Sequence, residues 1–182
     1  MRKLCVFESV SVDGFFTDSN DDVNWAHAGR EDAEFASWVG ANASSGRELL
    51  FGRKTYQMME SYWPSPMAAE QMPEVAKGMN AAKKYVISRT IHPTWKNTTL
   101  LDGDPVGAVQ KLKKTNGSNI TVLGSGCVAA LLAEAGLVDE YLFVIIPIAL
   151  GSGRTLFPQR NKLRLIDARS FRCGNVAVTY AV

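Results

Sequence analysis

Short apolar segments alternate with amphipathic ones along most of the chain. Residues 4–10 are apolar on both faces apart from Glu8 and Ser9, which is typical of a strand that is covered on both sides. Comparable short apolar runs predict further buried strands at residues 48–51, 85–87, 98–101 and 120–123.

The segments between these strands have helical patterns. Residues 31–43 have a helical pattern in which Trp38 and Val39 follow Phe35 by three and four positions. These side chains form one apolar stripe, which favours packing in the core. Asp104-Pro105 pairs a capping residue with a proline at the first helical position, so a helix should begin there. Two further helices are expected over residues 53–61 and after Gly126 to about Ala135, where Gly136 ends the pattern.

No long helical pattern returns after Glu140. Residues 141–147, 163–170 and 176–182 instead predict strands that complete the sheet. Strand–helix alternation followed by an antiparallel tail predicts an α/β fold in which helices cover a mixed sheet. A chain of 182 residues most simply forms a single domain over residues 1–182.

Composition excludes several classes of function. Lys and Arg number 20 against 18 Asp and Glu, so the chain lacks the strong positive charge of a dedicated nucleic-acid binder. No apolar run reaches the ~18 residues of a membrane helix. Three separated cysteines without a C-x-x-C pair, and only two histidines, predict no metal site. No long apolar run follows Arg2 and Lys3, so the chain lacks the pattern of a signal peptide and we expect a cytoplasmic protein.

The first candidate binding motif is Gly52-Arg53-Lys54-Thr55-Tyr56, directly after the predicted strand 48–51. Glycine permits a tight turn, and the helix that follows offers free N–H groups, its positive dipole end and two cations. The motif is therefore suited to binding an anion. Taken alone, a plain strand-to-helix turn with solvated cations explains it equally well.

The second motif is Gly124-Ser125-Gly126-Cys127-Val128-Ala129, which follows the predicted strand 120–123 and fits the G-x-G-x-x-G/A phosphate loop. A Rossmann fold requires an acidic residue at the end of the next strand. Here Asp139 and Glu140 precede that strand, so the motif predicts phosphate binding without a Rossmann fold.

The third motif, Ser88-Arg89-Thr90, ends the predicted strand 85–87. A hydroxyl beside a guanidinium suits phosphate recognition, and next to a dinucleotide it would favour NADP over NAD by binding the 2′-phosphate. A lone arginine in a turn is more often a surface residue. The three motifs gain weight together, because open α/β sheets bind ligands where their strands end.

Six segments occur in the order seen in the dihydrofolate reductase-like superfamily. The chain most resembles the C-terminal reductase domain of the riboflavin-biosynthesis deaminase–reductase and its stand-alone relatives. The similarity extends over essentially the whole chain and lies in residues 11–15, 51–56, 88–90, 124–126, 137–140 and 147–153.

This resemblance implies a three-layer α/β/α fold, NADPH as hydride donor and a homodimer. It assigns the first motif to the phosphates of the coenzyme, the third to the 2′-phosphate and the second to the pyrophosphate. The residues implied in NADPH binding are Gly52, Arg53, Lys54, Thr55, Ser88, Arg89, Gly124, Ser125, Gly126, Cys127 and Val128.

The catalytic residues are less closely defined. Dihydrofolate reductases carry a buried carboxylate on the first helix, and here only Asp32 and Glu34 lie near that position. The proton that hydride transfer requires could come from water positioned by Asp13, Asp32 or Glu8. The leading hypothesis is an NADPH-dependent reductase of a small-molecule ribosylamino-pyrimidine or pterin. A catalytically silent NADP(H)-binding dimer and a folate reductase proper remain as alternatives.

The apolar run Phe143-Val144-Ile145-Ile146 requires cover on both faces of its strand. Helices of the sheet can cover one face. The other face could be covered by the same chain or by a second subunit, and the resemblance favours an isologous homodimer.

Overall fold

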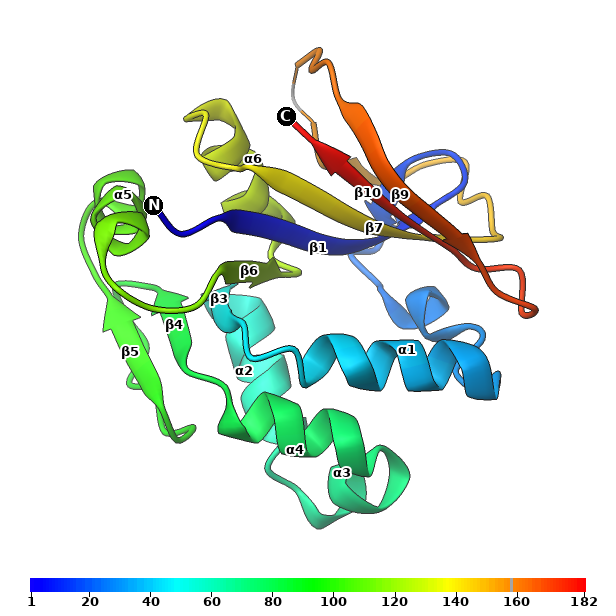
Figure 1. Cartoon of the computed structure of the whole chain (residues 1–182), viewed down its shortest axis with the longest axis horizontal. Helices are drawn as coiled ribbons and strands as arrows, with labels where there is room; N and C mark the ends of the chain where they lie inside the picture. Colours follow the sequence, from blue (N-terminus) through cyan, green and yellow to red (C-terminus); the bar gives the residue numbers. More distant parts are fainter. Residues whose placement is uncertain (158) are drawn as a thin grey trace.

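The computed structural model describes residues 1–157 and 159–182. Its core is an eight-stranded sheet in the order β5-β4-β3-β6-β1-β7-β10-β9 (Figure 1). The six strands from β5 to β7 are parallel, and β10 runs antiparallel to both β7 and β9. This confirms the predicted mixed sheet with an antiparallel C-terminal part. The strands are β1 (Leu4–Ser11), β3 (Glu48–Gly52), β4 (Lys84–Ile87), β5 (Thr98–Leu101), β6 (Ile120–Leu123), β7 (Glu140–Ile146), β9 (Arg164–Ser170) and β10 (Val176–Ala181).

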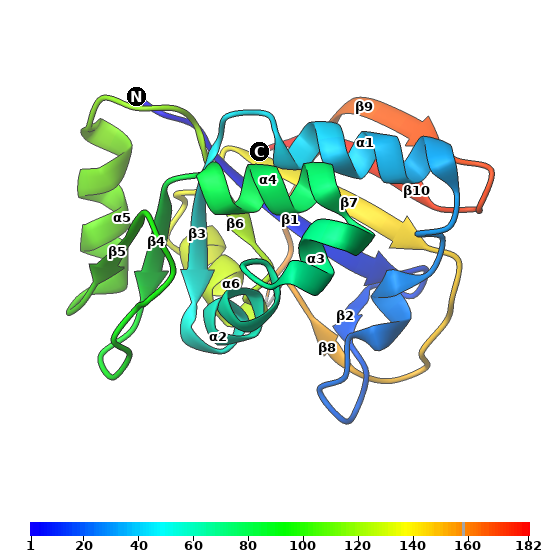
Figure 2. The same ribbon diagram turned by 90° about the horizontal axis from the view of Figure 1, so that it is seen from below.

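Helices cover both faces of this sheet, as the three-layer fold requires. α5 and α6 lie on one face, whereas α1, α3 and α4 lie on the other (Figures 1 and 2). The short strands β2 (Phe15–Thr17) and β8 (Arg154–Thr155) form a separate pair, and a 3-10 helix, η1 (Asn24–His27), precedes α1. The helices are α1 (Ala33–Ala43), α2 (Arg53–Tyr62), α3 (Pro66–Gln71), α4 (Pro73–Ala81), α5 (Pro105–Lys114) and α6 (Gly126–Glu134). None in the described ranges is long and apolar enough to cross a membrane.

Side chains of β1 alternate between the two layers. Leu4 and Val6 belong to the cluster that contains Val109 of α5 and Leu132 of α6. Cys5 packs on the opposite face with Phe35 of α1. The strand is thus covered on both sides, as its apolar pattern predicts.

The apolar run of β7 is covered by its own chain. Phe143 packs in the cluster beneath α5 and α6, while Val144 and Ile146 pack in the cluster with Phe35. Of the two options open from the sequence, cover by the same chain is therefore the one observed for this strand.

Residues 64–82 differ from the expectation. The sequence pattern predicts a helix over residues 53–61 and no further helix before the strand at 85–87, but α3 and α4 lie between them. Ser65 caps α3 by accepting a hydrogen bond from the Ala68 N–H, and each helix has a proline in its first turn. Because proline is tolerated in the first turn of a helix, Pro66 and Pro73 begin helices here.

Three helices carry side-chain caps at their N-termini. Asp32 caps α1, Ser65 caps α3 and Asp104 caps α5 as predicted. The N-termini of α2 and α6, which follow the first two glycine motifs, have no capping side chain. Their first N–H groups are therefore available to other acceptors.

Candidate active site

A cavity of about 610 Å³ lies at the carboxyl ends of β1, β3 and β6 and continues beneath α1 and α4. It forms where the sheet opens. β1 pairs with β6 only as far as Phe7, although its pairing with β7 continues to Ser11. Glu8 and Ser9 consequently line the cavity next to the gap left by β6. The volume lies within the range of ligand-binding pockets.

Two loops meet at the mouth of this cavity. The Gly52 N–H, at the end of β3, donates to the Ser125 hydroxyl at 2.6 Å. Ser125 is held in a left-handed conformation with φ 62°, and a Cβ on Gly52 would come within 3.0 Å of the Val128 side chain. The uncapped N-termini of α2 and α6 therefore start side by side. Together they make a site with free N–H donors and positive dipole ends.

The residues of the first two motifs come together as predicted from their places at strand ends. All but the last residue of each motif line the cavity, namely Gly52, Arg53, Lys54, Thr55, Gly124, Ser125, Gly126, Cys127 and Val128.

The third motif lies beside the cavity without lining it. β4 is the parallel neighbour of β3, and Gly52 pairs with Ile87, so Ser88 and Arg89 follow at the same edge of the sheet. The buried Ser88 hydroxyl accepts hydrogen bonds from the N–H groups of Thr90 and Ile91, both at 3.2 Å. This hydroxyl closes a turn. The exposed Arg89 forms no ion pair with another described residue and is available to a ligand.

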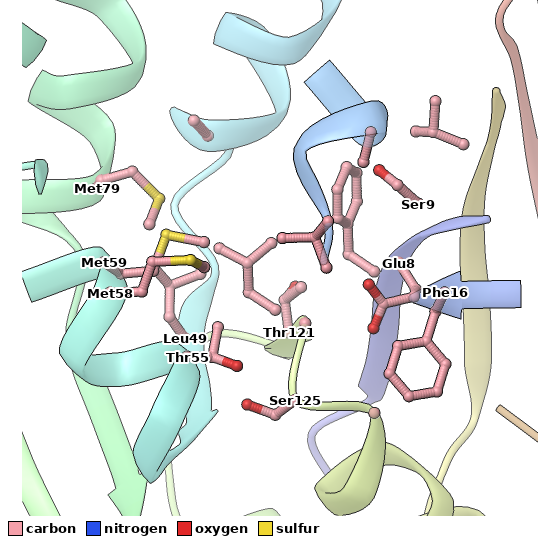
Figure 3. A pocket seen from close by; sticks show the side chains of 18 of the residues that line it. Glu8, Ser9, Phe16, Leu49, Thr55, Met58, Met59, Met79, Thr121 and Ser125 are labelled. Atoms are coloured by element: carbon pink, nitrogen blue, oxygen red, sulfur yellow. The ribbon is translucent and has the colours of Figure 1, made fainter. Parts of the chain in front are cut away.

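Gly126 has a packing role in addition to its place in the motif. A Cβ at this position would lie 2.1 Å from Cζ of Phe16. The absence of a side chain thus makes room for the Phe16 ring, which lies beside Glu8 in the cavity wall (Figure 3). Even without a ligand, the fold requires glycine here.

Glu8 is the one predicted catalytic carboxylate that lines the cavity. Its carboxylate points inward from β1, opposite a group of methionine side chains (Figure 3). Oε2 is shielded from solvent and has no hydrogen-bond partner among the described residues. Burial raises the pKa of Glu8 to about 8, against a smaller opposing effect of the Ser9 backbone N–H. At neutral pH this carboxyl group is mainly protonated and can act as an acid.

The other two predicted carboxylates have partners elsewhere. Asp13 accepts hydrogen bonds from the Ser11 hydroxyl at 2.6 Å and from the N–H groups of Leu150 and Gly151 at 3.1 and 2.7 Å. The Ser11 hydroxyl is the main cause that lowers the pKa of Asp13 to about 2. Asp32 accepts from the Phe35 N–H as the cap of α1. Asp13 therefore connects two loops through hydrogen bonds, and Asp32 caps a helix. Neither carboxylate lines the cavity.

Sequence reasoning missed two threonines in the cavity wall. Thr17 on β2 and Thr121 on β6 both line the cavity, and each has a buried hydroxyl oxygen with no partner among the described residues. Buried polar groups in folded proteins almost always have partners. Thr17, Thr121 and Oε2 of Glu8 thus contribute three polar atoms without partners among the described residues, all on side chains that line one cavity. Threonine is an ordinary strand residue, so no sequence signal marked these positions.

Arg154 is a further residue that the sequence did not single out, because Gly151-Ser152-Gly153-Arg154 fits a simple turn. Its guanidinium lies 2.8 Å from the Cys127 sulfur and pairs with Asp21 at 3.2 Å. It also lies over the Phe16 ring, 5.5 Å from its centroid. β8 thus brings a cation to the start of α6. Within the described ranges, no group of His, Cys, Asp or Glu is arranged to hold a metal ion.

Residues 2–179 match the RibD C-terminal domain. The chain belongs to this family. Two similar proteins come from Bacillus subtilis strain 168, and both are described as uncharacterized. YyaP is 29% identical over 182 residues, covering 98% of this chain and 94% of YyaP. YwjB is 22% identical over 175 residues, covering 93% and 92% of the two chains.

Three solved structures share the fold over the full length of this chain. A putative riboflavin biosynthesis protein from Shewanella sp. PV-4 has a TM-score of 0.70 at 21% identity, with 98% of its chain covered. A pyrimidine reductase-like protein from Corynebacterium diphtheriae has a TM-score of 0.67 at 16% identity, with 92% covered. RibD from Acinetobacter baumannii has a TM-score of 0.66 at 14% identity, and this chain covers 58% of it. The similarity confirms the predicted dihydrofolate reductase-like fold.

Proposed function

We propose that this chain is an NADPH-dependent reductase that delivers a hydride to a C=N or C=O bond of a small ring-containing substrate, with Glu8 as the proton donor. Membership of the RibD C-terminal domain family and the fold shared with a pyrimidine reductase-like protein support a reductase. The finer assignment rests on Glu8, whose carboxyl group points into the cavity and whose Oε2 has no partner among the described residues.

The mouth of the cavity fits the coenzyme. The paired N-termini of α2 and α6 offer N–H donors to phosphate oxygens, and Arg53 and Lys54 add positive charge. Arg89, beyond the end of the neighbouring strand, would bind the 2′-phosphate and so select NADPH. When bound, the nicotinamide ring supplies the hydride.

Glu8 would complete the reduction. Addition of a hydride to the carbon of a C=N or C=O bond leaves an electron pair on the nitrogen or oxygen. The protonated Glu8 carboxyl can give its proton to that atom and then recover one from solvent. Because the pKa of Glu8 is raised to about 8, the acid form is present at neutral pH, and the rate should fall as the pH rises above about 8.

A reductase assay tests this assignment. NADPH oxidation would be followed with a panel of pterins, aminopyrimidines and aromatic carbonyl compounds, for the unmodified chain and for Glu8→Gln. We expect turnover with at least one acceptor and a loss of about 10²-fold or more in Glu8→Gln. NADPH affinity, measured by nicotinamide fluorescence, should be the same in both proteins.

Two results would argue against the assignment. Full turnover in Glu8→Gln would mean that another group supplies the proton. Tight NADPH binding without turnover of any acceptor would favour the silent NADP(H)-binding protein.

A further inference from the structure

The segment between β4 and β5, residues 88–97, carries Arg89 and crosses from one edge of the sheet to the other. Because β4 and β5 are parallel, the chain leaves β4 at the carboxyl edge and returns to the amino edge, where the Lys84 N–H donates to the Asn97 carbonyl. Crossovers between parallel strands usually contain a helix. Residues 88–97, all of them described, form none, so their N–H groups need other acceptors.

Glu60, in the last turn of α2, supplies such an acceptor. Its Oε1 accepts hydrogen bonds from the N–H groups of Thr94 and Trp95, at 2.7 and 2.8 Å, and from the Thr94 hydroxyl at 2.6 Å. The Tyr56 hydroxyl, one turn earlier on α2, donates to the same oxygen at 3.0 Å. One carboxylate thus joins the later half of the segment to α2.

Glu60 is an unfavourable residue for its own helix. A carboxylate in the last turn meets the negative end of the helix dipole, and Glu60 forms no ion pair with another described residue. Partial burial raises its pKa, but the hydrogen bonds, led by that of the Thr94 hydroxyl, outweigh burial and hold the pKa below its ordinary value. Glu60 is therefore ionised at neutral pH, and its hydrogen bonds to the segment are charge-assisted.

The segment also packs against the strand that precedes the first glycine motif. The buried Trp95 ring has its centroid 6.1 Å from those of the Phe51 and Tyr56 rings. Its Nε1 donates to the Asn80 side chain at 2.7 Å, which fixes the orientation of the ring. Because Phe51 directly precedes Gly52, Trp95 connects the segment to the strand end at which α2 begins.

Arg89 lies between two fixed points of the segment. On one side, the Ser88 hydroxyl closes a turn that ends at Ile91, whose side chain is buried. On the other side, Glu60 holds residues 94 and 95. The Arg89 side chain itself is exposed. Since a cation on a fixed backbone loses less freedom when it binds, these contacts favour phosphate binding by Arg89.

We propose that Glu60 is a positioning residue for the choice of coenzyme. By holding residues 94 and 95 on α2, it sets the place of Arg89 relative to the N-terminus of α2, and so determines the preference for NADPH over NADH. The inference rests on the proposed function, because it requires Arg89 to bind the 2′-phosphate. Glu60 is not among the residues that line the cavity, so it acts through the segment and not by touching the coenzyme.

The ratio of NADPH affinity to NADH affinity in Glu60→Ala tests this proposal, measured by nicotinamide fluorescence on the full chain. Removal of a negative charge would by itself tighten binding of the more highly charged NADPH. We expect the opposite, a fall of about fivefold or more in NADPH affinity and of less than about twofold in NADH affinity. General damage to the fold would lower both affinities equally. An unchanged or higher ratio would overturn the proposal.

Glu134 provides a matched control. It is exposed in the last turn of α6, the other helix whose N-terminus lies at the cavity mouth, and it forms no ion pair with another described residue. Glu134→Ala removes the same charge without releasing residues 88–97, so the ratio should stay at or above its original value. An equal fall of the ratio in Glu134→Ala and Glu60→Ala would contradict the proposal.

Two milder variants keep the test decisive if Glu60→Ala does not fold. Glu60→Gln retains an acceptor oxygen at the same place and should keep most of the NADPH preference. Thr94→Val removes only the hydroxyl bond to Glu60 and should weaken NADPH binding about two- to threefold, with NADH binding unchanged. Equal weakening of both coenzymes in Thr94→Val would assign Glu60 a purely structural role.

A double variant shows whether Glu60 acts through Arg89. In the Arg89→Ala background, Glu60→Ala should cause no further loss of NADPH preference, because the two changes remove the same interaction. Additive losses would overturn the proposal. Equal affinity for NADPH and NADH in the unmodified chain would refute the assignment of Arg89 in the proposed function, and this inference with it. A preference that survives both Glu60→Ala and Thr94→Val would refute this inference alone.

Discussion

Glu8→Gln should make the folded chain more stable at alkaline pH, because glutamine has no charge to bury. The unperturbed pKa of this carboxyl group is 4.5, and burial raises it to about 8 in the folded chain. Between these values the folded state keeps a proton that the unfolded state has lost. The free energy of unfolding of the unmodified chain should therefore decrease as pH rises through this interval.

The slope of that decrease follows from proton linkage. One proton held only by the folded state changes the free energy of unfolding by roughly 1.4 kcal/mol per pH unit. Over the whole interval this amounts to an upper limit of roughly 4–5 kcal/mol. Because part of the Glu8 side chain is exposed to the cavity, we expect about 2–4 kcal/mol between about pH 5 and pH 8.

Urea unfolding of both proteins at several pH values measures this difference. The midpoint for the unmodified chain should approach that of Glu8→Gln near pH 5 and fall below it progressively toward pH 8. Other titrating groups cancel in the comparison because they are common to both chains. Parallel pH curves for the two proteins would refute the conclusion that the fold raises the pKa of Glu8.

Three further predictions concern neighbouring features. Gly126→Ala should lower the free energy of unfolding by about 1–3 kcal/mol, because the new Cβ would collide with the Phe16 ring. Thermal or urea unfolding measures this change, and unchanged stability would show that the ring can move away. Asp13→Asn should retain NADPH binding and turnover, since Asp13 fastens loops outside the cavity; lost turnover with normal binding would return Asp13 to the catalytic step. We propose that the chain forms a homodimer through edge strand β9, where Leu165 and Ile166 are 53% and 48% exposed. Light scattering should give twice the monomer mass at micromolar concentration. A monomer mass that does not change with concentration would refute the homodimer.

Much of the fold follows from local patterns in the sequence. The apolar runs of β1, β3 and β6 and the cap at Asp104 predict elements that the structure contains at nearly the same residues. The glycine motifs could be located because each directly follows a strand, and parallel strands end at one edge of a sheet. The mouth of the cavity was therefore predictable.

The part of the cavity beneath α1 and α4 was not predictable in this way. Its wall combines Met59, Met79 and Thr121, which come from three elements far apart in the sequence. α4, which carries Met79, follows a proline-rich stretch that looks like the end of helical structure. The pKa of Glu8 likewise depends on burial by residues from other parts of the chain, so the sequence could not separate Glu8 from Asp13 and Asp32.

Coenzyme titration tests the central claim most directly, namely that the cavity mouth binds NADPH. Nicotinamide fluorescence would be measured for NADPH and NADH with the unmodified chain and with Arg89→Ala. We expect NADPH to bind at least tenfold more tightly than NADH, which is ~1.4 kcal/mol, and Arg89→Ala to lose most of that preference. Equal affinity for the two coenzymes in the unmodified chain, or no binding of either, would contradict the account.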